Sequence, residues 1–179
     1  MPHIRRIPKS VSAVALTFVA LTITVVSTTA TAYAAPNAKV TAIFAMPRSY
    51  RSHPAVTYDP RSVPLGSRVA VLEQPNNLGG LVVKLKVWGL SPNTKYDAYV
   101  YTRPCGATPA SPGKRTQDGP STLHYAQNEV WLNFTTNVHG AAQSSDDQYW
   151  QFSASVANSV VVLSPTAQRL VACVTVPFK

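Results

Sequence analysis

The sequence predicts an all-β protein: a Greek-key β-barrel or β-sandwich of about eight short strands. Two observations favour this fold class. Beyond the first 35 residues, no stretch keeps the periodicity of an amphipathic helix. Short alternating or wholly apolar runs recur instead, and Gly, Pro, Asn and Ser separate them.

The clearest strand is 81–88, in which apolar residues alternate with Lys84 and Lys86. This pattern is typical of a half-buried antiparallel strand. The turn cluster at 75–80 connects it to the run at 67–74, so a hairpin is expected there. The other predicted strands are 39–45, 96–102, 129–135, 149–156, 159–163 and 170–176.

Two segments lack a strand pattern. Residues 46–64 are irregular and contain four prolines. Residues 103–127 are rich in Pro, Gly, Ser and Thr. A loop of that length inside a compact domain is usually functional or disordered.

The first 35 residues are expected to be a secretory signal peptide, and residues 36–179 a single domain. Basic residues precede an uncharged apolar run at 11–26, and Ala32-Tyr33-Ala34 forms an A-x-A cleavage signature. A membrane anchor is the alternative, since the apolar run is only slightly short of a span. The Arg5-Arg6 pair leaves the export route open between general secretion and the twin-arginine route.

The remaining chain is basic. Without Arg5, Arg6 and Lys9, 13 basic residues stand against seven acidic ones, a net charge of +6. An anionic component of the cell envelope is therefore a candidate partner, beside the alternative of a soluble protein that is simply basic. Nucleic acid is disfavoured, because no arginine-rich run or nucleic-acid motif is present.

Cys105 and Cys173 are the two cysteines of the chain. In an exported protein they are expected to form a disulfide. A redox-active pair is disfavoured, because C-x-x-C spacing is absent.

Several blocks, in order, resemble the copper/zinc superoxide dismutase family of the secreted bacterial type. The resemblance covers roughly residues 55–178 and implies a flattened Greek-key β-barrel of eight strands. It also implies a disulfide from the loop after the fourth strand to the last strand, matching the pair Cys105 and Cys173. The matching blocks are Val56–Pro60, Gly89–Tyr96, Pro104–Gly106, Asn128–Thr136, Ser159–Val162 and Val171–Phe178.

The resemblance also identifies where the family's copper ligands would lie. An H-x-H pair before the Cys-Gly turn supplies two of them, and this chain has Tyr99 and Tyr101 there. Their spacing puts both side chains on one face of a strand. The last copper histidine would follow the run at 159–162, where the chain has Leu163. A neutral phenol is a poor copper ligand at neutral pH.

Few zinc-site candidates remain. The bridging histidine would follow Gly119-Pro120, where Ser121 stands; a small insertion would align His124 with it. His124 and Asp118 are the weak metal candidates, and two ligands are too few for a closed zinc site. Arg169 is a candidate counterpart of the arginine with which the family guides superoxide.

These substitutions predict a secreted, non-catalytic superoxide dismutase-like protein with no cofactor, serving as a binding or structural protein of the envelope. The alternatives are a functional superoxide dismutase, which would carry copper and zinc under a different ligand alignment, and a low-affinity metal-handling protein built around His124. A further hypothesis is an aromatic patch in which Tyr96 and Tyr125 join Tyr99 and Tyr101.

Overall fold

The computed structural model describes residues 37–152, 156–164, 166 and 168–179. The predicted signal peptide lies outside these residues. The described part confirms the all-β prediction, with strands throughout and one short 3₁₀ helix, η1 (Pro47–Ser49). No helix in this part is long and apolar enough to cross a bilayer.

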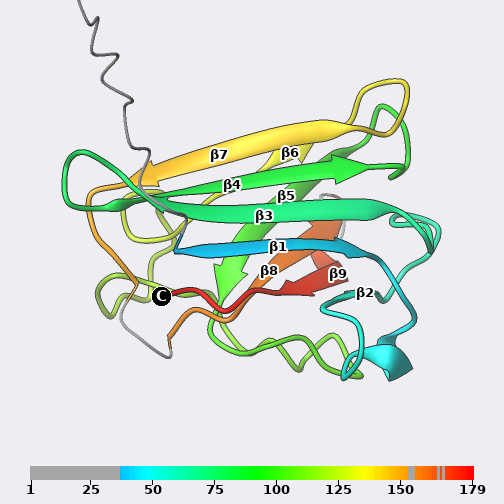
Figure 1. Ribbon diagram of the computed structural model, residues 1–179, viewed down its shortest axis with the longest axis horizontal. Coiled ribbons are helices and arrows are strands. Elements are labelled where there is room, and N and C mark those ends of the chain that lie inside the picture. Colours follow the sequence, from blue (N-terminus) through cyan, green and yellow to red (C-terminus); the bar gives the residue numbers. More distant parts are fainter. Residues whose placement is uncertain (1–36, 153–155, 165, 167) are drawn as a thin grey trace, which may run out of the picture. The chain divides into compact units, whose positions relative to one another are not determined.

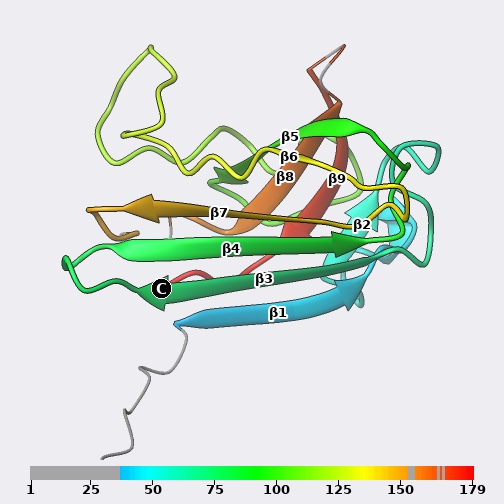
Figure 2. The same cartoon turned by 90° about the horizontal axis from the view of Figure 1, so that it is seen from above.

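The strands form two antiparallel sheets, which Figures 1 and 2 show as two layers. The pairings between described residues make a sandwich and no closed barrel, which corrects the barrel form of the prediction. The first sheet has the order β1 (Ala38–Ile43), β3 (Arg68–Pro75), β4 (Leu81–Trp88) and β7 (Ala142–Gln148). The second has the order β2 (Ala55–Thr57), β9 (Arg169–Thr175), β8 (Ser159–Ser164), β5 (Lys95–Tyr101) and β6 (Phe134–Thr135).

The main core lies between the two sheets and follows from the alternation of side chains along each strand. In β4 Leu81, Val83, Leu85 and Val87 are buried, while Lys84 and Lys86 are exposed, as the alternation predicts. The hairpin from β3 to β4 is also confirmed, with Pro75 opposite Leu81. Burial of this apolar surface is the main favourable contribution to folding.

The structure differs from the predicted strands in two places: one strand, β7, was not predicted, and another, β6, is shorter than predicted. β7 was missed because its sequence, AQSSDDQ, is polar; it lies at the sheet edge, where polar strands are common. In 129–135 the alternating apolar residues Val130, Leu132 and Phe134 are buried, but the regular strand is limited to β6. There the N–H of Ala98 donates to the side-chain oxygen of Asn133 (2.9 Å), which interrupts the backbone ladder.

Two further differences concern short segments. β2 lies within the segment expected to be irregular and pairs with β9. Residues 149–152 and 156, the described part of the predicted strand 149–156, form no strand. Trp150 and Phe152 are nevertheless buried, and the indole N–H of Trp150 donates to the carbonyl of Gln127 (3.0 Å). Their apolar side chains fill the core without a strand partner for the backbone.

The predicted disulfide between Cys105 and Cys173 is confirmed. The two Cα atoms lie 5.7 Å apart across a sequence separation of 68 residues. The bond fastens the loop after β5 to the last strand, and the N–H of Cys105 also donates to the hydroxyl of Thr175 (3.0 Å).

We predict that the double variant Cys105→Ala/Cys173→Ala loses about 4 kcal/mol of unfolding free energy, because closure of so long a loop restricts the unfolded chain. Urea denaturation of the oxidised wild type and the variant measures the difference. Wild type held in reductant is the control and should match the variant. Equal stabilities of the oxidised wild type and the variant would contradict the prediction.

Glu73 is a buried carboxyl on the inward face of β3. Its Oε2 accepts the backbone N–H of Lys179 (3.2 Å), while its Oε1 has no hydrogen-bond partner among the described residues. Burial raises the pKa of Glu73, and the contacts with Lys179 and Asn37 offset this only in part. The folded protein therefore holds a proton on Glu73 more tightly than the unfolded chain does.

Because the folded pKa is the higher one, the unfolding free energy should fall as pH rises from the unfolded pKa through the folded pKa. We predict that Glu73→Gln removes this part of the pH dependence, and that it gains stability relative to wild type as pH rises. Urea denaturation across that range measures it. Asp118→Asn, which removes an exposed carboxyl, is the matched control. Parallel curves for wild type and Glu73→Gln would refute the expectation.

Candidate functional site

The outer face of the second sheet carries the three positions where the resemblance puts copper ligands. In the pairing of β5 with β8, Tyr99 lies opposite Val161, and Leu163 lies opposite Asp97. Tyr99 and Leu163 belong to a second apolar cluster, outside the main core, against which Tyr101 packs. The structure thus brings the three positions onto one side of the sheet.

Tyr99 is held between two other side chains. The guanidinium of Arg115 lies 3.6 Å from the centre of its ring, close enough for a cation–π contact. Trp131 approaches edge-on, with ring centres 5.8 Å apart. Tyr99 is only 6 % exposed, and burial raises the pKa of its phenol against the opposing effect of Arg115. Its side chain is therefore a neutral, packed phenol.

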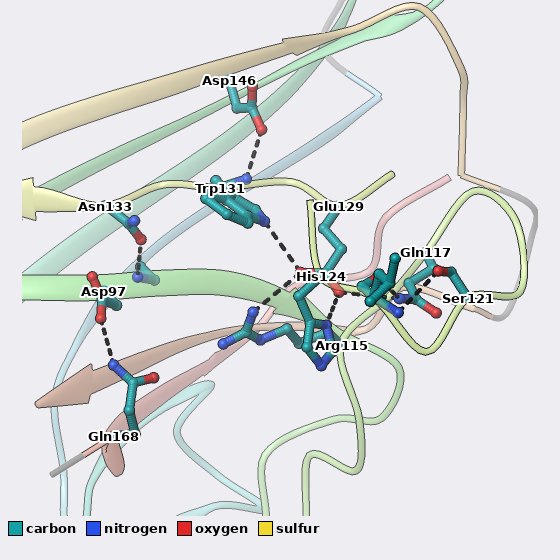
Figure 3. A network of polar contacts seen from close by, with 12 residues as sticks. Asp97, Arg115, Gln117, Ser121, His124, Glu129, Trp131, Asn133, Asp146 and Gln168 are labelled. Atoms are coloured by element: carbon teal, nitrogen blue, oxygen red, sulfur yellow. Dashed lines mark hydrogen bonds and ion pairs between the residues drawn. The ribbon is translucent and has the colours of Figure 1, made fainter. Parts of the chain in front are cut away.

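A buried carboxylate, Glu129, joins Arg115 and Trp131 into one network of polar contacts (Figure 3). Its side chain is 1 % exposed. Oε2 accepts hydrogen bonds from Arg115 Nη1 (3.2 Å) and from Trp131 Nε1 (3.1 Å). Oε1 accepts one from Gln117 Nε2 (3.2 Å) and contacts Nδ1 of His124.

The network also decides the charge of Glu129. Burial by itself would raise the pKa of the carboxyl, since it disfavours the charged form. The hydrogen bonds from His124, Trp131 and Arg115 outweigh burial, so the pKa of Glu129 lies below its ordinary value. The site therefore contains a carboxylate that is ionised and already bonded.

Backbone pairing explains how Arg115 reaches Tyr99. Arg115 forms an isolated antiparallel bridge with Tyr101. On either side of it, the N–H of Thr116 donates to Val100 (2.9 Å) and that of Thr102 to Lys114 (2.9 Å). The middle of the long loop 103–127 thus runs beside β5. From its place opposite Tyr101, Arg115 extends its guanidinium diagonally over Tyr99.

The two weak metal candidates, His124 and Asp118, contact different residues. His124 contacts Glu129 with a side chain that is 57 % exposed. Asp118 is exposed, and its backbone N–H donates to the carbonyl of Asn128 (3.0 Å). Within the described ranges, no three His, Cys, Asp or Glu side chains gather as a metal-binding group.

Arg169, the candidate anion guide, begins β9 opposite Ser164. Its guanidinium is exposed and forms an ion pair with Asp59 (2.5 Å). Burial would raise the pKa of Asp59, but its hydrogen bonds with Arg61 and Ser62 and the charge of Arg169 lower it overall. The described structure thus places Arg169 in an ion pair at the Leu163 end of the sheet.

The aromatic-patch hypothesis is corrected for Tyr96. This side chain points into the main core and stacks on Phe134 with ring centres 5.2 Å apart. Its hydroxyl donates a hydrogen bond to the backbone carbonyl of Ser62 (2.6 Å). The reason is spacing: an odd separation along β5 puts Tyr96 and Tyr99 on opposite faces. Tyr125 is 43 % exposed. The aromatic partner of Tyr99 is Trp131 instead.

Sequence reasoning missed the roles of Arg115, Glu129 and Trp131. A partial signal existed for two of them, because Glu129 and Trp131 alternate with the inward residues of the run 129–135 and so share its other face. Arg115 had no such signal, since its position depends on the path of a long loop.

The polar groups on this outer face are already bonded to one another. The carboxylate of Glu129 and the guanidinium of Arg115 neutralise each other, and together with Trp131 they fasten the loop onto the sheet. No protein-family model and no curated protein matches this sequence. On this face the hydrogen bonds of Glu129 and the contact of Arg115 with Tyr99 indicate a structural network.

We predict that Arg115→Met lowers the unfolding free energy by about 2–4 kcal/mol, because it removes the main charged partner of a buried carboxylate. In the double variant with Glu129→Gln, the loss should be smaller than the sum of the two single losses. Urea denaturation measures all three variants. Arg48→Met, on an exposed residue, is the control and should have little effect. Additive losses would show that the pair is not coupled.

The same pair has a pH signature. Since the folded pKa of Glu129 is the lower one, its contribution is present above the unfolded pKa and is lost as pH falls through the folded pKa. Glu129→Gln should therefore lose less stability than wild type on acidification.

Proposed function

We propose that the protein is a superoxide dismutase-like Greek-key sandwich without copper–zinc catalysis, exported to serve as a binding or structural protein of the cell envelope. The observation that carries the proposal is the packing of Tyr99 beneath Arg115. At a position where the resemblance puts a copper ligand, the chain has a neutral phenol covered by the guanidinium of Arg115, which is itself paired with Glu129.

The strand connections support the fold family. Apart from the three-residue β2, eight strands remain. β7 returns beside β4, and β8 beside β5, after passages through the opposite sheet, as in the long return connection of a Greek key. The disulfide joins the loop after β5, the fourth of these eight, to the last strand, as the resemblance implies.

The electrostatics support the absence of copper chemistry. The guanidinium of Arg115 covers the ring of Tyr99 and is paired with Glu129, so a copper ion could reach this ring only by displacing a bonded side chain. The phenol of Tyr99 also resists ionisation, because its pKa is raised. Two carboxylates act on Tyr99, and both are already bonded: Glu129 by Arg115 and Trp131, and Asp97 by Gln168. These groups favour packing over metal ligation.

An exported role is supported by the disulfide, which persists in oxidising compartments, and by the signal-like N-terminal sequence. The basic charge of the domain supports an anionic partner. An envelope protein with a packed outer face in place of a metal centre would act through its other surfaces.

Metal analysis and superoxide turnover of the secreted protein, after incubation with copper and zinc, test the proposal. We expect no stoichiometric copper and no turnover. Bound copper with turnover would establish a functional dismutase and overturn the proposal. Copper bound without turnover, and lost in His124→Ala, would overturn it in favour of a metal-handling protein.

The variant Tyr99→His/Tyr101→His restores the two-histidine spacing on this face and should raise copper affinity. The matched control is Lys84→His/Lys86→His, which puts the same spacing on β4 of the other sheet. A gain no larger than that of the control would show that the face offers nothing beyond a generic histidine pair. No gain at all would remove the support for the family's ligand positions.

A further inference from the structure

The outer face of the first sheet is open and basic. Along β4, Lys84, Lys86 and Trp88 point outward at successive same-face positions, and all three are exposed. Same-face neighbours on a strand lie about 7 Å apart. The register adds two cations: Lys39 of β1 shares a row with Lys84 through Leu72, and Arg68 of β3 lies opposite Trp88.

This face has little compensating negative charge. None of the ion pairs found among the described residues involves its four cations. Asp147 of β7 shares the face, opposite Val82, but it accepts a hydrogen bond from Asn76 (2.6 Å). Asp146, its neighbour, accepts a hydrogen bond from the backbone N–H of Trp131 (2.6 Å) instead. Four positive side chains thus stand open to solvent against one bonded carboxylate.

Hollows give the face a shape. One of about 570 Å³ is lined by residues including Arg68 and Trp88. A second, of about 460 Å³, contains Lys84 and Lys86, and a smaller third is lined by Lys86 and Trp88. Because the third shares residues with both others, the hollows follow β4 from Trp88 to Lys84.

We propose that this face binds an acidic polysaccharide, a linear chain of sugar rings that carry carboxylates. The lysines match a polymer with repeated negative charges. Trp88 is 42 % exposed and offers a flat apolar surface on which a sugar ring can stack, with a polar N–H at its edge. The proposal rests on the binding role inferred above, and the outer face of the second sheet takes no part in it.

Two other anionic partners fit the face less well. A single-stranded nucleic acid would need several aromatic platforms and benefits from arginine, whereas this face has one tryptophan and one arginine among its cations. A membrane surface would need a broad apolar face to insert. Here Ile43 and Trp88 are the exposed large apolar residues on the strands of the face.

Binding of polygalacturonate chains to the secreted protein, measured by calorimetry at several salt concentrations, tests the proposal. We expect Lys84→Gln/Lys86→Gln to weaken binding at least tenfold and to reduce its salt dependence. Trp88→Ala should weaken binding with an unchanged salt dependence. The matched control, Lys95→Gln/Lys114→Gln, removes the same charge from exposed positions outside this sheet and should change affinity by less than threefold.

Equal weakening by the two lysine pairs would reduce the interaction to net charge and overturn the proposal. Binding of neutral dextran as tightly as polygalacturonate would also overturn the proposal. So would binding of single-stranded RNA or of anionic phosphatidylglycerol vesicles by a protein that does not bind polygalacturonate. Copper content is independent of these results. A protein with copper and turnover that still binds polygalacturonate through Lys84 and Lys86 would refute the proposed function alone.

Discussion

The second sheet is apolar on both faces, and much of the structure follows from the need to cover it. In β8 the residues Val160 and Val162 face the first sheet, while Val161 and Leu163 face the other way, and all four are buried. A sheet with such strands cannot leave one face in water without losing the free energy of burial. The chain between β5 and β7 supplies cover on the outer side, with Arg115 and Trp131 over β5.

The chain between β5 and β7 covers that face only if it is fastened to the sheet at several points. One of these points is the ion pair between Arg115 and Glu129. The disulfide holds the beginning of this segment against β9, and Glu129 holds its later part. Once buried, the Glu129 carboxylate requires donors, since an unpaired buried charge is costly. Arg115 meets that need while its guanidinium packs on Tyr99. Tyr99, Tyr101 and Leu163, where the resemblance puts copper ligands, thus take part in packing.

The first sheet is organised differently. Its inner face completes the core, whereas its outer face has no covering segment among the described residues and carries Lys39, Lys84 and Lys86. The molecule therefore has one outer sheet face whose polar groups satisfy one another and another whose charges remain open to solvent. Open charges of one sign are available to a partner, while the bonded charges of Glu129 and Arg115 are not.

Local pattern in the sequence was sufficient for the strands β3, β4, β8 and β9, for the common face of Tyr99 and Tyr101, and for the pairing of the cysteines. These features follow from side-chain alternation along a strand and from the pairing expected of two cysteines in a chain predicted to be exported. Tertiary structure alone decided that β7 is a strand, that Trp131 packs against Tyr99, and that Arg115 covers Tyr99. These last features depend on contacts between segments far apart in the chain, because a polar edge strand and a loop arginine acquire their roles only from the surfaces they meet.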